Sequence, residues 1–345
     1  MKKLYFILIT IICGMFVSCT DSEEVEFKSS LTIKTSLESA KSGFQEYKAG
    51  DFELSDEYRI RVTNYIYDEN GKLVQQQQIL AKQYTEDVDM NFVLPDGNYK
   101  VLTTSDVIKG NSLNTYDKSY WEPSNIESLN SIVITKQNII GYNGMGILTL
   151  TETEIKLYQG KKEVFVKVKP VTAMIRAFIT NIHAWDGVIM DDNTSRTMTY
   201  LEISYLSKWI DKAEYNNGNW NFNSSAPETS SYLLTKVDLT DSRWDNFSSG
   251  YGLISVLPGT YKFMGYARFI WSADSKEYYS TTDESQTLQL QSGQEYNVNF
   301  AVDEFDISFK EAQALKKREA VQFDIYANSE LKEQNNSLRV KDIIK

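Results

Sequence analysis

The chain has 345 residues, of which 47 are Asp or Glu and 36 are Lys or Arg, giving a formal net charge of -11 at pH 7. This length excludes a small disulfide-stapled protein, and the negative charge disfavours binding to phosphate backbones, so we expect no nucleic-acid partner. With 41% hydrophobic residues, 22 Tyr and 16 Phe, the chain has the composition of a folded protein rich in strands, which excludes disorder over most of its length.

The N-terminus has the pattern of a secretory signal peptide. Two lysines precede an apolar run at 4–17, which is too short for a comfortable membrane span. Cys19 follows Ser18 at the end of this run, and the segment resembles a bacterial lipobox. The resemblance implies cleavage between Ser18 and Cys19, loss of residues 1–18 and acylation of the Cys19 thiol. The alternative is an ordinary signal peptide with an incidental cysteine.

The residues after this cysteine are acidic. Loss of the signal peptide removes Cys13 and two lysines, so the mature chain of 327 residues forms no intramolecular disulfide and has a net charge of -13. We therefore expect covalent attachment to the membrane through lipid, not electrostatic attraction. Residues 19–26 form an acidic tether, in which Asp21, Glu23 and Glu24 resemble the export signals that place lipoproteins on the outer face of Bacteroidetes outer membranes. A plain solvated tether is the alternative.

From residue 25 onward, hydrophobic and polar residues alternate with the period of a strand, which predicts an all-β fold. The first strands are expected at 27–37 and 58–67, and Asn70-Gly71 predicts a hairpin turn before a return strand at 73–80. The segment 106–128 is predicted to be a long loop, with Trp121 and Pro123 covering one end of a sandwich. Further strands are predicted at 88–94, 98–104, 131–136, 146–150, 163–169, 171–182, 199–206, 231–239, 251–257, 260–271, 286–291 and 295–302, and Asn217-Gly218 predicts another hairpin.

A short motif occurs twice, as Leu94-Pro95-Asp96-Gly97-Asn98-Tyr99-Lys100 and as Leu257-Pro258-Gly259-Thr260-Tyr261-Lys262. The two copies are 163 residues apart, about half of the mature chain, which indicates tandem domains of similar architecture. Pro170 lies near the midpoint, so the predicted domains are 27–169 and 170–305. Chance recurrence of a short motif is the alternative.

These residues together resemble the fimbrial subunit lipoproteins of Bacteroidetes, of the FimB/Mfa2 kind. The resemblance covers roughly residues 25–305. It rests on the lipobox at Cys19, the hairpin at 65–73, both copies of the repeated motif, the strand at 170–177 and the segment 290–296. It implies two tandem Greek-key β-sandwiches of transthyretin-like fold, with other fimbrial subunits as partners. Members of this family serve as membrane anchors, as tip components or as surface proteins of unassigned role.

The last part of the chain, 306–345, is predicted to be an extension with a short helix at 308–320 followed by a strand. The alternating residues of that strand are Val321, Phe323, Ile325 and Ala327, and 338–344 predicts a second short strand. The family resemblance implies that such a strand is donated into a groove of a neighbouring subunit, where main-chain hydrogen bonds give affinity. The alternative is a strand pair packed on the chain's own second sandwich.

Familiar catalytic motifs are absent from the sequence. The chain has a single histidine, His183, and it lacks a G-x-S-x-G elbow, a P-loop and a G-x-G-x-x-G fingerprint, so we expect no enzyme and no cofactor. The run Asp191-Asp192-Asn193 lacks the spaced ligands of a calcium loop and indicates a polar turn, so we expect no metal. Four tryptophans in the second half suggest a possible glycan ligand, although most are expected to face a core: Trp209, Trp220, Trp244 and Trp271.

The sequence therefore predicts a lipid-anchored protein of the outer membrane, exposed at the cell surface, that acts as a fimbrial anchor or accessory subunit and assembles by strand addition. The alternative prediction is a surface glycan-binding lipoprotein that serves a nutrient importer.

Overall fold

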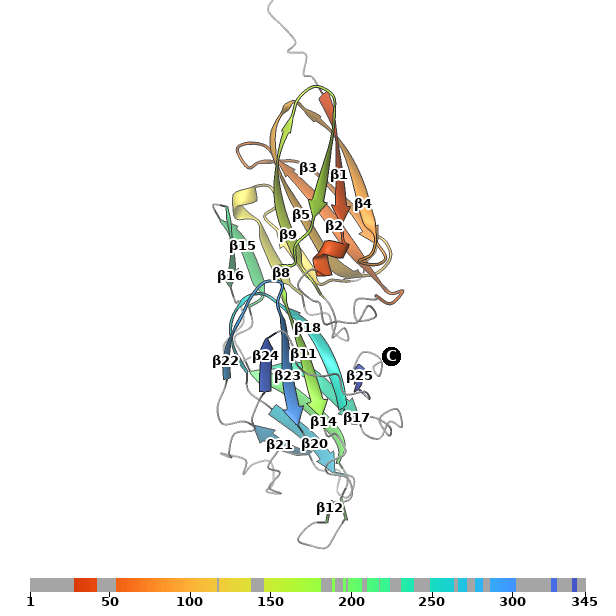
Figure 1. The fold of residues 1–345 in the computed structure, drawn as a ribbon, viewed down its shortest axis with the longest axis vertical. Helices are drawn as coiled ribbons and strands as arrows, with labels where there is room; N and C mark the ends of the chain where they lie inside the picture. The colour runs from red at the N-terminus through yellow and green to blue at the C-terminus, as the bar shows by residue number, and fades with distance from the viewer. Residues whose placement is uncertain are drawn as a thin grey trace, which may run out of the picture.

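The computed structural model is an elongated molecule whose two halves follow one another along the long axis (Figure 1). It describes the following residues: 28–41, 54–116, 118–137, 146–180, 188–189, 195–196, 198–206, 210–216, 218–223, 231–238, 249–263, 266–271, 277–281, 286–301, 324–327 and 337–339. These residues form strands and two short 3-10 helices, η1 (Glu38–Lys41) and η3 (Leu129–Ser131), with no α-helix among them. The expected all-β fold is confirmed for the described part of the chain.

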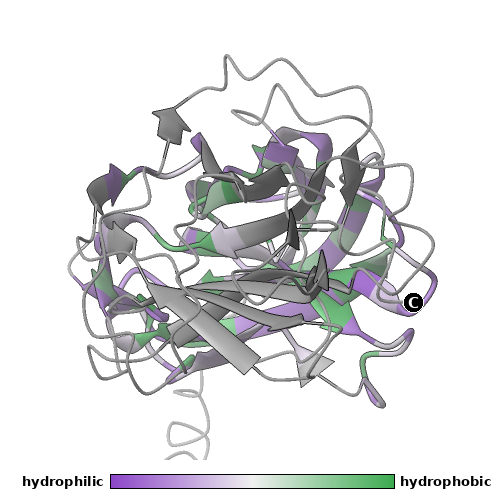
Figure 2. Cartoon of the chain, turned by 90° about the horizontal axis from the view of Figure 1, so that it is seen from below, coloured by the Kyte–Doolittle hydropathy of each residue, from purple (hydrophilic) through white to green (hydrophobic). Residues whose placement is uncertain are grey.

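The first half contains a three-stranded sheet in the order β10-β1-β4, formed by β1 (Lys28–Ser36), β4 (Asp87–Pro95) and β10 (Lys161–Lys167). Burial alternates along β1 and β4, as the period-2 pattern requires when one face of a sheet is buried. Figure 2 shows the hydropathy of the described residues, with hydrophobic and hydrophilic segments interspersed along the chain.

The second sheet of the first half is formed by β2 (Tyr58–Tyr67), β3 (Leu73–Ala81), β5 (Gly97–Lys109), the short β6 (Lys118–Ser119) and β9 (Thr149–Leu157). The path runs β3-β2-β5-β6, and β9 also pairs with β5. One continuous core lies between the two sheets, with Leu31 and Ile33 from the first sheet and Ile60, Val62 and Val101 from the second, all fully buried. This packing of two sheets on one core is a β-sandwich.

The second half repeats this strand order. Its first sheet runs β24-β23-β11-β18-β25, and its second sheet runs β17-β14-β20-β21, with β19 and β22 paired beside them. The short strands β12 and β13 form a separate pair. The bounds are β11 (Ala173–Thr180), β12 (Val188–Ile189), β13 (Ser195–Arg196), β14 (Met198–Leu206), β17 (Ser231–Asp238), β18 (Ser249–Val256), β19 (Gly259–Phe263), β20 (Tyr266–Trp271), β21 (Glu277–Thr281), β22 (Gln286–Leu290), β23 (Glu295–Ala301), β24 (Asp324–Ala327) and β25 (Ser337–Arg339).

Strand pairing shows that the repeat is architectural. In the first half, the opening strand β1 pairs in parallel with the closing strand β10 and antiparallel with β4. In the second half, the opening strand β11 likewise pairs in parallel with the closing strand β23 and antiparallel with β18. The repeated motif follows β4 in one half and β18 in the other. The recurrence of the motif is therefore not a coincidence of sequence.

The motif makes the same hydrogen bond in both halves. The Tyr99 hydroxyl donates to the carbonyl oxygen of Pro95 at 2.8 Å, and the Tyr261 hydroxyl donates to that of Leu257 at 2.8 Å. In each case a tyrosine early in a strand bonds back to the backbone four residues upstream, which is the geometry of a tyrosine corner. The bond fixes the turn that carries the chain from one sheet of the sandwich to the other.

A third sheet joins the two halves, and we call it the junction sheet. Its order is β16-β15-β8-β7, with β7 (Trp121–Ser124) and β8 (Val133–Lys136) from the first half and β15 (Lys212–Asn216) and β16 (Asn219–Asn223) from the second. The antiparallel pairing of β8 with β15 crosses between the halves. Hydrogen bonds of a sheet therefore hold the two halves together.

The junction sheet corrects the prediction of a long loop at 106–128. β5 continues to Lys109, and β6 and β7 lie within the predicted loop. Trp121 is buried in the common core, and its indole N–H donates to the carbonyl oxygen of Gly146 at 2.8 Å. The strand predicted at 146–150 is also displaced, because β9 begins at Thr149 and runs to Leu157. The helix predicted at 308–320 lies outside the described residues.

Candidate assembly site

The C-terminal segment provides strands at both edges of the second half's first sheet. β24 pairs antiparallel with β23, in a register that places Ile325 opposite Val298 and Ala327 opposite Tyr296. β25 pairs in parallel with β18 at the other edge, from Ser249↔Ser337 to Tyr251↔Arg339. The three-stranded unit seen in the first half is thus extended to five strands in the second.

These added pairings are short. β24 contributes four residues and β25 three, whereas β11 and β23 pair over seven registered positions. Strand addition is held by main-chain hydrogen bonds, so a segment of the same kind from another chain can make the same bonds at the same edges. The edges of this sheet, at β23 and β18, are accordingly the candidate assembly site.

The structure places part of the predicted donor segment at this site. Ile325 and Ala327 lie in β24, paired with the chain's own β23, which is the alternative that the sequence left open. Val321 and Phe323 lie outside the described residues, so donation to a neighbour stays a prediction. Ser18, Cys19, Asp21, Glu23 and Glu24 also lie outside them, as do His183 and the run 191–193.

The opposite end of the molecule carries the start of the described chain. β1 begins at the end of the first half that is remote from the second half (Figure 1). The end of the molecule at which β1 begins is therefore remote from the half that carries the candidate assembly site.

Packing at the junction sheet fixes the connection between these two ends. Tyr215 of β15 donates its hydroxyl to Glu152 of β9, and its ring meets Trp220 edge-on at 5.2 Å. Burial, together with the Glu152 carboxylate, raises the pKa of Tyr215, so this hydroxyl stays a donor at physiological pH. A buried cluster forms beneath the sheet: Tyr65, Tyr67, Leu102, Leu129, Ile132 and Tyr215. The second half is thus packed onto the outer face of the first half's second sheet.

Lys136, at the end of β8, makes a further contact between the halves. Its ammonium group donates to the carbonyl oxygen of Ser255 at 3.1 Å and lies 5.4 Å from the centre of the Tyr120 ring. Burial lowers the pKa of Lys136 well below its usual value, and the nearby Asp211 carboxylate opposes this effect. Lys136 thus links the end of β8 to β18 of the second half.

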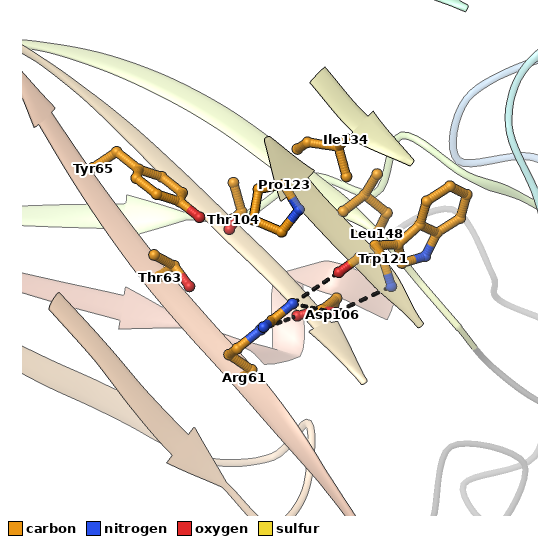
Figure 3. A pocket seen from close by; sticks show the side chains of 9 residues that line it. All are labelled: Arg61, Thr63, Tyr65, Thr104, Asp106, Trp121, Pro123, Ile134 and Leu148. Carbon is orange, nitrogen blue, oxygen red and sulfur yellow. Dashed lines mark hydrogen bonds and ion pairs between the residues drawn. The ribbon is translucent and has the colours of Figure 1, made fainter. Parts of the chain in front are cut away.

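The first half also contains a buried ion pair, shown in Figure 3. Arg61 of β2 donates two hydrogen bonds of 2.9 Å to the carboxylate of Asp106 on β5, and one of 2.8 Å to the carbonyl oxygen of Trp121. Burial raises the pKa of Asp106 to about 6 despite the opposing effect of Arg61. Arg61 itself stays charged because the Asp106 carboxylate outweighs the cost of burial and raises its pKa.

This cluster supports structure, not chemistry. The guanidinium is bonded on all three of its nitrogens, with Nη1 donating to the Tyr116 hydroxyl at 3.2 Å. The surrounding space is small and is lined by the side chains of Figure 3. Its effect is to tie β2, β5 and β7 together, because each strand supplies one partner of the network.

The described ranges contain neither a cluster of metal ligands nor a membrane-spanning helix. No group of three or more His, Cys, Asp or Glu side chains in them is arranged to hold a metal ion. None of the helices in these ranges is long and apolar enough to cross a membrane.

The two tryptophans whose side chains the structure describes serve packing, whereas Trp209, Trp244 and the side chain of Trp271 lie outside the described part. Trp121 is buried, and Trp220 is half-buried against the core. Large exposed aromatic side chains occur instead at Phe165 and Tyr158, which are 72% and 62% exposed.

The sequence pattern does not predict the junction sheet. Asn217-Gly218 marked the hairpin between β15 and β16, and Gly218 has the positive φ of 85° that such a turn requires. The local pattern gave no sign that β8, about 80 residues earlier, would pair with β15. Pairing between strands so far apart in sequence depends on the packing of the two halves.

No protein-family model matches this chain, and no curated protein matches it. The structure is similar to the fimbrial anchor protein Mfa2 from Porphyromonas gingivalis, with 9% identity over 87% of this chain and 99% of that chain and a TM-score of 0.40. It is similar to the tip fimbrial protein Mfa3 from the same organism, solved with a C-terminal truncation, with 9% identity over 87% and 100% and a TM-score of 0.41. A third similar structure, described as a candidate polysaccharide-binding protein from Bacteroides thetaiotaomicron, has 12% identity over 89% and 100% and a TM-score of 0.44. The identities and TM-scores are low, so the function is drawn from this chain's own residues.

Proposed function

We propose that this protein is a lipid-anchored surface protein that acts as a fimbrial anchor or accessory subunit and joins other subunits by strand addition. The observation that carries the proposal is the position of the two terminal segments. Lipid on Cys19 would hold the free end of the first half, and the C-terminal strands meet the sheet edges of the second half.

The chemistry of the candidate assembly site supports this role. The pairings of β24 and β25 with their own sheet are short and use main-chain groups. Exchange with an equivalent segment of another subunit would preserve those hydrogen bonds, so the free-energy difference between the two arrangements is small. In this proposal the protein catalyses no reaction, and its role is to connect a membrane to a filament.

The architecture also suits a connector between a membrane and a filament. A tensile force between the two ends would be transmitted through the junction sheet, where strands of both halves pair and Tyr215 bonds to Glu152. We propose that each half is a transthyretin-like domain and that the chain belongs with the fimbrial lipoproteins which its sequence motifs resemble.

Electron microscopy of filaments tests the proposal. Cells that lack the protein should carry longer filaments or shed them into the medium, because nothing terminates and holds them. A Cys19→Ser variant should lose labelled fatty acid and reproduce the shedding. Unchanged filaments in the deletion strain would contradict the anchor role, and absent filaments would indicate a tip or obligatory subunit.

A second experiment tests the role of the C-terminal segment in assembly. A chain ending at Ala320 keeps the lipid site and both halves but lacks β24 and β25, so it should reach the surface and fail to join filaments. An Ile325→Pro variant in the full chain provides the matched comparison, since proline removes a single N–H from the strand. A truncated protein that still joins filaments would remove the donor role.

A second candidate function is surface glycan binding in a nutrient-uptake system. The observation that favours it is the exposure of the Phe165 and Tyr158 rings, because sugars stack on exposed aromatic rings. One face of the Phe165 ring carries the Lys34 ammonium group at 5.3 Å from its centre, which leaves the other face for a sugar. Binding of soluble polysaccharide that is lost in a Phe165→Ala, Tyr158→Ala variant, with filaments unaffected, would establish this function in place of the first.

A further inference from the structure

β3 is an edge strand without a charged residue. It comprises Leu73–Ala81, with four consecutive glutamines at Gln75–Gln78, and it ends the path of its sheet. At its start the Leu73 N–H donates to the carbonyl oxygen of Glu127 at 3.0 Å, so the open part of the edge begins at Val74. Val74 is 44% exposed, and Gln75, Gln76 and Gln77 are also exposed. An edge of this length that carries no charge or proline is open to pairing with another strand.

The other edges of the described first half are protected. β10 carries Lys161, Lys162, Glu163 and Lys167, and β4 carries Asp87, Asp89 and a terminal proline. β9 carries Glu152, Glu154 and Lys156. Charges placed on edge strands are a common device against unwanted pairing. β3 lacks such charges, which indicates that its edge pairs with another strand.

β3 also projects beyond the sheet that faces it. Its register places Gln77 opposite Asn64 and Gln75 opposite Ile66, and both of these β2 residues are fully buried. Gln75 and Gln77 share their face of the sheet with these residues, and they are nevertheless exposed. The opposing sheet therefore leaves this part of β3 uncovered, so an incoming strand meets no steric obstacle from it.

We propose that this edge, β3 from Val74 to Gln78, pairs antiparallel with the same edge of a second copy of this chain. Antiparallel pairing about a two-fold axis places each residue opposite another residue of the same strand, so a charged edge would meet its own charge. A glutamine amide has both donors and acceptors and can therefore bond to its own copy. Because the whole chain has a net charge of -11, an uncharged strip is the part of the surface where two copies approach at the least electrostatic cost.

The pairing is expected to be weak in solution. A single strand edge buries less than the roughly 1,200 Å² typical of stable complexes. We expect a dissociation constant on the order of 10 μM, and a common membrane would raise the effective concentration further. This inference is independent of the proposed function, because it concerns the half of the molecule that is remote from the C-terminal strands.

Sedimentation of residues 19–345 carrying Cys19→Ser, at concentrations up to on the order of 100 μM, tests the proposal. The protein should form dimers, and a Gln76→Lys, Gln77→Lys variant should weaken self-association by roughly tenfold or more, because like charges then face one another. Gln137→Lys is the matched control, since Gln137 is exposed and lies outside β3. Thermal unfolding of each variant should show unchanged stability.

Crosslinking in the same background locates the contact. Single Gln76→Cys and Gln77→Cys variants should be joined by a short bismaleimide, whereas Asn91→Cys on β4 should not. A wild-type protein that stays monomeric at the highest concentration overturns the proposal. Dimers that persist in the double lysine variant, or that crosslink equally well from β4, also overturn it.

Discussion

Tyr99 and Tyr261 occupy equivalent positions in the two halves, and each donates its hydroxyl to a backbone carbonyl oxygen four residues upstream at 2.8 Å. Their surroundings differ. Tyr261 is fully buried and also accepts a hydrogen bond from the backbone N–H of Ile210, whereas Tyr99 is 7% exposed. The same corner is thus more deeply enclosed in the second half.

This difference predicts unequal effects of removing the hydroxyl. Tyr261→Phe should lower the free energy of unfolding by about 1–3 kcal/mol, because it leaves a buried carbonyl oxygen and a buried N–H unpaired. Tyr99→Phe should cost about 0.5–1 kcal/mol, because water can reach the freed carbonyl. Urea unfolding measures both, with Tyr158→Phe on an exposed ring as the control. Equal losses at the two corners would contradict the prediction.

Gly97 and Gly259 each lie two residues before the tyrosine of their corner. Substitution by alanine is expected to change the free energy of unfolding in opposite directions at the two positions. Gly259 has a φ of +145°, and a Cβ there would lie 2.1 Å from Ile210 Cδ1. Gly259→Ala should therefore lower the free energy of unfolding by about 1–3 kcal/mol through backbone strain. A Cβ on Gly97 would meet only ordinary contacts near 3.5 Å, with Tyr99. Gly97→Ala should be neutral or stabilising by up to about 1 kcal/mol, and a large loss there would contradict the model of the turn.

Replacing one member of the Arg61–Asp106 pair is expected to destabilise the protein much more than replacing both. Arg61→Met should lower the free energy of unfolding by about 3–5 kcal/mol, because it leaves a buried carboxylate without its counter-charge. The double variant Arg61→Met, Asp106→Leu should recover most of that loss, since no uncompensated charge remains. Chemical unfolding of both variants measures this, and a double variant no more stable than Arg61→Met would contradict it.

The raised pKa of Asp106 adds a pH dependence with a defined sign. The carboxyl has a pKa of about 6 in the folded protein and an ordinary value of 3.8, so the folded state holds the proton more tightly. Its contribution to stability is present below the ordinary value and is lost as the pH rises through about 6. The free energy of unfolding of the wild type should thus fall relative to the double variant between pH 4 and pH 6, as measured by urea titration. A constant difference would contradict this assignment.

For Lys136 we expect the opposite pH dependence, in which its contribution to the free energy of unfolding rises with pH. Its pKa in the folded protein lies well below the ordinary 10.5, so the unfolded state binds more protons between these two values. Its contribution to stability is therefore present above 10.5 and is lost as the pH falls through the folded value. The free energy of unfolding of the wild type should rise relative to Lys136→Met from pH 7 to pH 10. Lys156→Met, at an exposed position, is the control and should show a flat difference.

Local signals in the sequence predicted the hairpin of β2 and β3 closely. Alternation placed the strands at 58–67 and 73–80, and the structure has them at Tyr58–Tyr67 and Leu73–Ala81, with Gly71 at a φ of 78°. The turn and the alternation are properties of adjacent residues, so they can be read without knowing the fold. The repeated motif was equally informative, because its two copies mark equivalent turns after β4 and β18, although the hydroxyls of Tyr99 and Tyr261 bond to the backbone and were expected to reach water.

The segment 106–128 shows where this reasoning fails. β7 contains a proline and spans four residues, Trp121–Ser124, and it pairs with β8 across η3. Such short strands have too few residues for a period to be recognised. What stabilises them is burial of Trp121 and pairing with neighbours that include β15 of the other half. Neither effect exists until the tertiary structure forms.

The all-β character, the motif of each repeat, the hairpin turns and the expected lipid site at Cys19 can be predicted from the chain alone, because each depends on residues that are close together along it. The junction sheet, the burial of the Arg61–Asp106 pair and the uncovered edge at β3 depend on the folded arrangement. These features arise from contacts between strands that are far apart in sequence. Their free energy comes from packing and from main-chain pairing, which alternation along a single strand does not specify.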